Sequence, residues 1–334
     1  MRRAIELARR AGSDTKSNPQ VGAVLVYNGR IIGEGYHMKY GESHAEVNAV
    51  ASVSKNERHL ISKSSIYVSL EPCCFFGKTP ACTDLILKEG IKKVYVSYVD
   101  KTPEVSGQGL AILRSKGVEV NENILEEEGE LLAMPRNVLA DENRPYVILK
   151  YAESNDGFLS KEGSQIWLTS HFSKVLVHKW RSESDAITVG KNTILVDNPS
   201  LDNRLFYGGN PKRIVLDRKN NLGKDYKIFD NSSDTIVLSE GSDQDTEEQN
   251  FLETFNWSSI LKSLAERKVK TLFVEGGAKL LSAIYESGLW DETRLLISQT
   301  NLNEGIRVQK PAAWNEIQRL KVGKDTLIQI RPNR

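Results

Sequence analysis

The interpretation of this chain rests on His44-Ala45-Glu46 and on Glu71-Pro72-Cys73, which Cys82 follows nine residues later. One imidazole and two thiolates supply three protein ligands to a tetrahedral zinc ion and leave one position open for water. The two thiolates cancel the charge of the ion, and zinc lowers the pKa of a bound water to roughly 7. The pattern therefore predicts a catalytic zinc site with His44, Cys73 and Cys82 as ligands and Glu46 as the proton carrier.

Simpler explanations exist for each part of this pattern. Ser43 and Glu46 fit a capping box that would only satisfy the first amides of a helix. Cys73 and Cys74 fit two buried small apolar residues, or Cys74 could be the fourth ligand of a structural zinc ion. Neighbouring residues at a strand end point to opposite faces, which disfavours a shared ion. The joint pattern favours the catalytic site, with His44 and Cys82 each opening a helix.

His-x-Glu with Pro-Cys and a second Cys is typical of zinc nucleobase deaminases, which usually have Pro-Cys-x-x-Cys. Here eight residues separate Cys73 from Cys82. This insert carries Lys78, which is either a phosphate or substrate contact or an ordinary surface lysine. A nucleic-acid base as substrate is disfavoured by the long insert and by the charge balance of the chain.

The bulk composition predicts an ordinary soluble globular protein of two domains. The chain has 334 residues, of which 39% are apolar and 27% charged, and its formal net charge is +1. Near-neutrality argues against a bulk electrostatic grip on nucleic acid. No run approaches the ~18 apolar residues of a membrane span, and the N-terminus lacks the apolar core of a signal peptide. Three cysteines at uneven spacing favour a reducing compartment, so a cytoplasmic location is expected.

The distribution of apolar residues predicts two successive α/β domains. Asn28-Gly29 between two β-rich runs signals a hairpin, and strands are expected at 66–70 and 93–99 with a helix between them. The polar, proline-containing segment 134–145 is expected to be a linker, which gives domains 1–143 and 144–334. A solvated loop is expected at 240–250. In the second half, strands are expected at 146–150, 186–189, 213–216, 235–238, 271–274, 294–297 and 326–330, and helices near 174–180, 260–267 and 279–287.

The second half gives weaker chemical signals on its own. Glu275-Gly276-Gly277 lies between an apolar strand and a helix, where backbone amides can approach an anion, although a double glycine is more often only a turn. Arg181 and Arg204 could clamp a phosphate or simply be solvated. On composition alone, Trp167 packs in a core more often than it stacks on a nicotinamide.

Taken together, the motifs resemble those of the bifunctional deaminase–reductase family of riboflavin biosynthesis. The resemblance covers nearly the whole chain, and the motifs occur in the same order. In the first half it rests on Asn18-Pro19-x-Val21-Gly22, Gly33-Glu34-Gly35-x-His37, His44-Ala45-Glu46-Val47, Glu71-Pro72-Cys73 and Gly77-Lys78-Thr79-Pro80-x-Cys82. In the second half it rests on Lys150-x-Ala152-x-Ser154-x-Asp156-Gly157, Trp167-x-Thr169-Ser170, Val189-Gly190, Thr193, Asp197-x-Pro199-x-Leu201-x-x-Arg204 and Glu275-Gly276-Gly277.

This resemblance implies a cytidine-deaminase-like three-layer α/β/α domain followed by a dihydrofolate-reductase-like α/β domain. The first would deaminate 2,5-diamino-6-ribosylamino-4(3H)-pyrimidinone 5′-phosphate with one zinc ion per chain. The second would reduce the ribosyl chain to a ribityl chain with NADPH. The partners implied are this small phosphorylated substrate and further copies of the chain, in a dimer or tetramer, with neither nucleic acid nor membrane. The rival hypotheses are a single-activity zinc nucleobase or nucleoside deaminase and a non-catalytic zinc-stabilised binding module.

The resemblance also assigns roles to individual residues. The deaminase pocket would be lined by Asn18, His37, Lys78 and Asp100. NADPH would meet Ala152, Trp167, Thr193, Asp197, Gly277, Ala278, Lys279 and Leu280. The reductase substrate would meet Gln165, Arg181, Leu201, Arg204 and Glu275.

Three positions depart from the family pattern. Cys74-Phe75 replaces the usual Ser-His, and Phe75 cannot donate a hydrogen bond. Gln165 replaces a substrate-binding serine, although its amide can still donate and accept. Arg218 replaces a small hydroxyl residue, and is either a contact to the 2′-phosphate of NADPH or a surface arginine.

Overall fold

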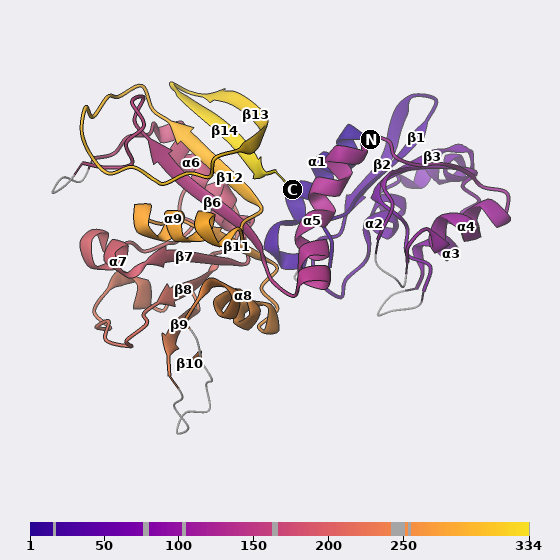
Figure 1. The fold of residues 1–334 in the computed structure, drawn as a ribbon. Coiled ribbons are helices and arrows are strands. Elements are labelled where there is room, and N and C mark those ends of the chain that lie inside the picture. The colour runs from indigo at the N-terminus through magenta and orange to yellow at the C-terminus, as the bar shows by residue number, and fades with distance from the viewer. Residues whose placement is uncertain are drawn as a thin grey trace. The chain divides into compact units, whose positions relative to one another are not determined.

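The computed structural model describes residues 1–15, 18–75, 80–101, 105–161, 166–241, 251–252 and 255–333 (Figure 1). The chain divides into two compact units, Met1–Glu142 and Asn143–Arg334, and each is described by itself. No helix within the described segments is both long and apolar enough to cross a membrane.

The N-terminal unit is built around a mixed five-stranded sheet in the order β2-β1-β3-β4-β5. The β1–β2 and β1–β3 pairs are antiparallel, and β3, β4 and β5 run parallel. Its elements are α1 (Arg2–Ala8), β1 (Gly22–Tyr27), β2 (Arg30–Tyr36), α2 (Ala45–Ala51), β3 (Ser65–Leu70), α3 (Cys82–Lys88), β4 (Lys93–Tyr98), α4 (Gln108–Ser115), β5 (Glu119–Asn121) and α5 (Glu126–Glu142), with 3₁₀ helices at Arg9–Thr15 and Lys55–Lys63.

The β1–β2 hairpin turns where the sequence predicts. Asn28 and Gly29 have φ of 47° and 77°, the left-handed pair that a type I′ turn needs. On β2, Gly35 lies so close to α2 that an added Cβ would be 2.4 Å from the amide nitrogen of Ala49. The absence of a side chain therefore lets α2 pack directly on the sheet, and α2 carries His44 at its start.

Helices cover both faces of this sheet because its strands alternate. Ala23 and Leu25 of β1 belong to the apolar cluster that also contains buried residues of α2, α3 and α4. Val24, between them in the sequence, packs on the opposite face with Ala4 and Leu7 of α1. The expected three-layer α/β/α fold is confirmed.

The prediction of a linker at 134–145 is wrong for most of that segment. Residues up to Glu142 continue α5, and Pro135 lies inside this helix. The helix survives because one side of it is anchored: Ala133 is buried and packs with Leu70 and Tyr98 of the sheet. Polar residues that suggested a linker, such as Asp141 and Glu142, lie on the solvent-facing side of this packed helix.

The C-terminal unit contains a nine-stranded sheet in the order β10-β9-β8-β7-β11-β6-β12-β14-β13. Strands from β10 to β12 in this order run parallel, and β14 and β13 add an antiparallel edge. Its elements are β6 (Tyr146–Glu153), α6 (His171–Ser182), β7 (Ala186–Gly190), α7 (Lys191–Asp197), β8 (Lys212–Leu216), a 3₁₀ helix (Lys227–Phe229), β9 (Thr235–Glu240), β10 (Phe251–Leu252), α8 (Trp257–Glu266), β11 (Thr271–Val274), α9 (Ala278–Ser287), β12 (Glu292–Ile297), β13 (Trp314–Val322) and β14 (Asp325–Pro332).

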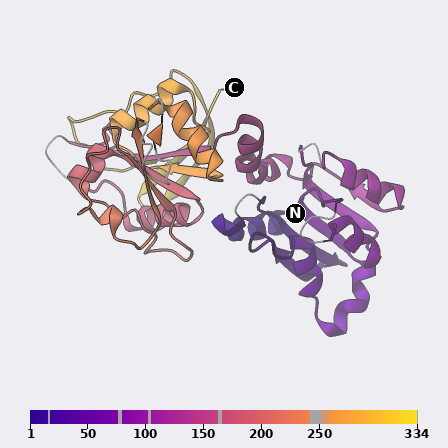
Figure 2. The same ribbon diagram turned by 90° about the horizontal axis from the view of Figure 1, so that it is seen from below.

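Alternation also explains the layers of this unit, whose helices lie on both sides of the strands (Figure 2). Leu272 and Val274 of β11 pack in the cluster that contains the buried faces of α8 and α9. Phe273 points the other way and meets Trp180 of α6, with ring centroids 6.3 Å apart. The seven predicted strands and three predicted helices are present. The expected loop at 240–250 lies almost wholly outside the described residues.

Candidate active sites

The three predicted metal ligands converge in the N-terminal unit. His44 is the N-cap of α2, Cys73 follows β3, and Cys82 is the first residue of α3. The Nδ1 atom of His44 lies 3.3 Å from Sγ of Cys82 and 3.5 Å from Sγ of Cys73. All three ligand atoms lie within 4.8 Å of one another. The segment after β3 and the starts of α2 and α3 thus bring together three ligands, of which the two furthest apart in the sequence are separated by 38 positions.

This spacing fits a zinc ion. Zn–S bonds of about 2.3 Å and Zn–N bonds of about 2.0 Å in a tetrahedron place sulfur and nitrogen about 3.6 Å apart. The cluster already has a stabilised sulfur: a hydrogen bond from Cys82 lowers the pKa of Cys73 to about 4, and the first amide of α3 donates to the same sulfur at 3.4 Å. Within the described parts of the chain, Cys74 does not join the cluster. The geometry therefore favours three protein ligands over four.

Glu46 lies beside this cluster with only 3% of its surface exposed. Burial raises the pKa of Glu46, and the charge on Cys73 raises it further. A carboxyl group with a raised pKa is suited to taking up and releasing a proton near neutral pH. The capping-box alternative is wrong, because the N-cap is His44 rather than Ser43 and no side chain caps the helix.

Two of the predicted zinc ligands, His44 and Cys73, line a cavity of about 220 Å³, which is also lined by Asn18, His37 and Asp100. His37 is buried, and its Nδ1 donates to the carbonyl oxygen of Ser43 at 3.1 Å. Its Nε2 therefore accepts from the amide of Asn18, at 3.0 Å. Three of the four predicted pocket residues are thus brought together. Lys78, the fourth, lies outside the described residues.

Arg136 and Glu71 hold parts of this pocket in place by hydrogen bonds, and no role was predicted for either residue. Arg136 of α5 donates to the carboxylate of the buried Asp100 at 2.6 Å. Glu71 accepts from the backbone amides of Asp100, Gly107 and Gly109 at 3.2, 2.9 and 2.9 Å. One carboxylate thereby joins the loop before Cys73 to the segment that follows β4. Arg136 was missed because its segment resembled a linker.

Phe75 is on the wall of the same cavity with 49% of its surface exposed. Tyr40, 37% exposed, is a second aromatic residue on this wall. The position at which the family usually has a polar residue is therefore an apolar part of the pocket in this chain.

A second cavity, of about 620 Å³, lies in the C-terminal unit at the carboxyl ends of the parallel strands. Helices α7, α8 and α9 begin at it, with Gly190, Asn256 and Gly277 as N-caps. Exposed amides at helix starts favour phosphate groups. Five predicted cofactor residues line it: Thr193, Gly277, Ala278, Lys279 and Leu280.

The other predicted cofactor residues do not line this cavity. Ala152 lies on β6, and Asp197 ends α7. Trp167 is 74% exposed, with the Lys174 ammonium 4.9 Å from its ring centroid, so the alternative of a core tryptophan is wrong. Arg218 forms a two-point ion pair with Glu240 at 2.6 and 2.9 Å, as a surface arginine would.

Two of the predicted substrate residues of this unit, Arg181 and Glu275, form a partly buried ion pair. Arg181 donates to both carboxylate oxygens of Glu275 at 2.6 and 3.1 Å, and Lys150 lies 3.6 Å from one of them. Burial raises the pKa of Glu275, but the charges of Arg181 and Lys150 more than offset it and hold that pKa at about 2. Lys150, whose own pKa burial lowers, was not assigned a role from the sequence. Gln165 lies outside the described residues.

The loop with Leu201 and Arg204 lies next to this ion pair. Arg181 donates to the carbonyl oxygen of Asp202 at 2.9 Å, and the carboxylate of Asp202 pairs with Arg204. Leu201 is buried, with φ of 50°. Two units thus contain two separate sites: a metal-binding cluster with a buried carboxyl group, and a phosphate-type cleft with a charged cluster nearby.

Comparisons with known proteins agree with both sites. Residues 1–98 match the cytidine and deoxycytidylate deaminase zinc-binding region, and residues 145–302 match the RibD C-terminal domain. The riboflavin biosynthesis protein RibD of Aquifex aeolicus is 35% identical, over 97% of this chain and 93% of the relative. That of Bacillus amyloliquefaciens is 36% identical, over 87% and 81%.

Solved structures show the same two-unit chain. A diaminohydroxyphosphoribosylaminopyrimidine deaminase/5-amino-6-(5-phosphoribosylamino)uracil reductase of Thermotoga maritima has a TM-score of 0.87 and 35% identity, covering 99% of this chain and 97% of its own. RibD of Acinetobacter baumannii has a TM-score of 0.84 and 30% identity, covering 100% and 98%.

Fold and sites together define a zinc-type deaminase joined to a reductase. The chain belongs to the RibD family of riboflavin biosynthesis, whose members are bifunctional deaminase–reductases.

Proposed function

We propose that the N-terminal unit deaminates 2,5-diamino-6-ribosylamino-4(3H)-pyrimidinone 5′-phosphate and that the C-terminal unit reduces the ribosyl chain of the product to a ribityl chain. One zinc ion per chain would be held by His44, Cys73 and Cys82, and NADPH would occupy the cleft at the starts of α7 and α9. When bound, zinc supplies the Lewis acidity that activates water, and NADPH supplies the reducing electrons.

In the deaminase, Glu46 takes a proton from the attacking water and delivers one to the departing amine, which leaves as ammonia. Its burial and raised pKa support both transfers. Asn18 and His37 orient the pyrimidine, because their hydrogen bond fixes both side chains on the cavity wall. Arg136 holds the side chain of Asp100 in place as an acceptor for the substrate.

In the reductase, Thr193 and the start of α9 at Gly277 bind the cofactor, and Ala152, Trp167 and Asp197 extend this contact. Arg181, Glu275, Leu201 and Arg204 bind the sugar phosphate. Positive charge from Arg181 and Lys150 beside the Glu275 carboxylate, with Arg204 on the neighbouring loop, suits a ligand that carries both hydroxyl groups and a phosphate.

The convergence of one imidazole and two sulfurs beside a buried glutamate is the observation that carries this proposal. The test is a two-part assay on the full chain. With the diaminopyrimidine, ammonia release should precede NADPH oxidation. With 5-amino-6-(5-phosphoribosylamino)uracil, NADPH oxidation should begin at once and without ammonia.

The two halves of the proposal fail separately in this assay. Ammonia release without NADPH oxidation from either compound would overturn the reductase half. NADPH oxidation with the uracil compound alone, and no ammonia from the diaminopyrimidine, would overturn the deaminase half.

A further inference from the structure

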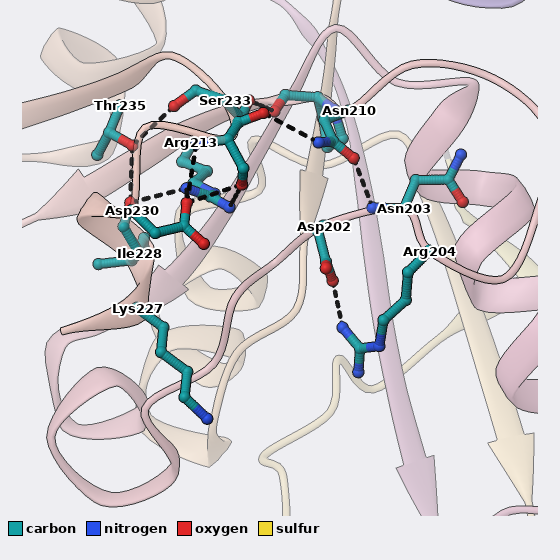
Figure 3. Close-up of polar contacts among 12 residues, drawn as sticks. Asp202, Asn203, Arg204, Asn210, Arg213, Lys227, Ile228, Asp230, Ser233 and Thr235 are labelled. Carbon is teal, nitrogen blue, oxygen red and sulfur yellow. Dashed lines mark hydrogen bonds and ion pairs between the residues drawn. The ribbon is translucent and has the colours of Figure 1, made fainter.

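The loop from Leu201 to Arg204 is held by side chains that lie outside it, and Figure 3 shows the contact of one of them, Asn210, with Asn203. We infer that Asn210 and His178 are positioning residues of the reductase, which fix the backbone from which Arg204 reaches the sugar phosphate. This inference rests on the proposed function, because it takes Arg204 as a substrate contact.

Three successive residues of the loop each have a backbone group bound to a side chain. The carbonyl oxygen of Asp202 accepts from Arg181 at 2.9 Å. The amide of Asn203 donates to Oδ1 of Asn210 at 2.7 Å, and the amide of Arg204 donates to Nδ1 of His178 at 3.2 Å. Such bonds replace those of a helix or sheet, so this irregular segment has a defined backbone.

The loop needs this support because its conformation is unfavourable by itself. Leu201 has φ of 50°, and Asn198, the C-cap that follows α7, has φ of 41°. A left-handed backbone is unfavourable for leucine and persists only where its surroundings impose it. The Arg204 side chain is 51% exposed, and its ion pair among the described residues is with Asp202 of the same loop, so its place depends on the loop backbone.

Asn210 connects this loop to a rigid anchor. Its Nδ2 donates to the carbonyl oxygen of Ser232 at 3.1 Å. The side chain of Ser232 accepts from the fully buried Arg213 of β8 at 2.7 Å, and Arg213 also donates to Asp230 at 2.7 Å. The buried guanidinium thus fixes the turn to which Asn210 is attached (Figure 3).

His178 connects the loop to α6. It lies on this helix three residues before Arg181, so both side chains project from the same face. The imidazole is buried, and its Nδ1 must be unprotonated to accept from Arg204. In His178→Asn, the amide oxygen of asparagine can occupy the position of Nδ1 and accept the same hydrogen bond, whereas leucine in His178→Leu has no acceptor.

The first test replaces Asn210→Ala in the full chain and measures steady-state reduction of 5-amino-6-(5-phosphoribosylamino)uracil. We expect KM to rise about tenfold with kcat within about twofold, because a misplaced Arg204 weakens ground state and transition state alike. Ser233→Ala is the matched control: it removes a bond of 2.6 Å to Pro211 beside the network but does not touch the loop. Its KM should be unchanged, as should NADPH affinity and ammonia release in both variants.

The second test asks whether Asn210 acts through Arg204. In a double-mutant cycle, adding Asn210→Ala to the Arg204→Ala variant should raise KM by less than about twofold relative to Arg204→Ala alone.

The third test concerns His178. The His178→Asn variant should retain the wild-type KM, and the His178→Leu variant should raise KM about tenfold.

The outcomes separate this inference from the function it rests on. If the wild-type chain does not reduce the uracil compound, the proposed function is wrong. If the wild-type chain does reduce it, three results would each show that the positioning role is wrong. Asn210→Ala could leave KM unchanged, or it could raise KM as much in the Arg204→Ala background as in the wild type. The control Ser233→Ala could also raise KM as much as Asn210→Ala does.

Discussion

Glu46 differs from the other carboxylates of its pocket in how its proton is controlled. Asp100 is paired with Arg136, and Glu71 is saturated by backbone amides. Glu46 is buried beside a sulfur cluster, and both circumstances favour its protonated form. Burial raises the pKa of Glu71 as well, but backbone amides occupy its oxygens. Glu46 lies beside the predicted metal ligands, which suits it to cycling a proton during the reaction.

Replacing Glu46→Gln tests this assignment. The amide preserves size and hydrogen bonding but cannot carry a proton between water and amine. We expect ammonia release to fall on the order of 10³-fold while bound zinc, measured by elemental analysis, is unchanged. Unchanged turnover would exclude Glu46 as the proton carrier, and loss of zinc would instead show a role in building the site.

The Lys150–Glu275–Arg181 group provides a second test at the scale of single residues. Glu275→Gln would leave two buried cations without a carboxylate, so we expect loss of NADPH oxidation and destabilisation of the C-terminal unit by about 3–5 kcal/mol. Thermal unfolding of the full chain measures the second effect. Lys150→Met leaves the Arg181–Glu275 pair intact and should destabilise less. An exposed control, Arg218→Gln, should leave the thermal unfolding of the chain essentially unchanged.

Among the secondary-structure elements, helix α6 carries both Arg181 and His178, and His178 makes the reductase site sensitive to acid. Burial, and then the charges of Arg181 and Arg204, lower the pKa of His178 to about 4. In the unfolded chain its pKa is about 6.5. As pH falls from about 6.5 to about 4, the unfolded state gains a proton that the folded state resists, so stability is lost across that window and not further below it.

His178→Asn should remove this acid sensitivity. Because asparagine accepts from Arg204 and does not titrate, the variant should lose less stability than the wild type between pH 6.5 and pH 4, by about 1–3 kcal/mol. Calorimetry of both proteins at several pH values measures the difference. Parallel stability curves for the two proteins would show that His178 does not control this transition.

At the same scale, the sequence predicted elements better than it predicted their ends and edges. Strands whose side chains are buried on both faces of the sheet, such as β1 and β11, were evident from their continuous runs of apolar residues. β13 was missed because most of its residues are exposed and polar, as suits an edge strand. α5 was hidden by Pro135 and by its polar exposed face, and with it the contact of Arg136 to Asp100 was lost.

For the whole molecule, the metal ligands could be predicted from the spacing of residues in short motifs. The reductase residues were predicted only through the family resemblance, and the contacts among them, including that of Lys150, were not predicted. Lys150 and Glu275 are 125 positions apart, and only the pairing of β6 with β11 brings them together. The bond from Arg204 to His178 depends likewise on a loop of irregular backbone, which no periodicity encodes. The cytoplasmic location and the dimer or tetramer stay predictions.

The two sites lie in separate units, so damage to one should spare the other. Cys82→Ser should abolish ammonia release but leave NADPH oxidation with the uracil compound within about twofold of wild type. Equal loss of both activities would contradict functional independence of the two units.

The most direct test of the account is the zinc content of the purified full chain by elemental analysis, compared among wild type, Cys74→Ser and Cys82→Ser. Three protein ligands with Cys74 outside the cluster predict one zinc per chain in wild type and in Cys74→Ser, and little or none in Cys82→Ser. Zinc lost from Cys74→Ser as completely as from Cys82→Ser, or a wild-type chain that binds none, would contradict it.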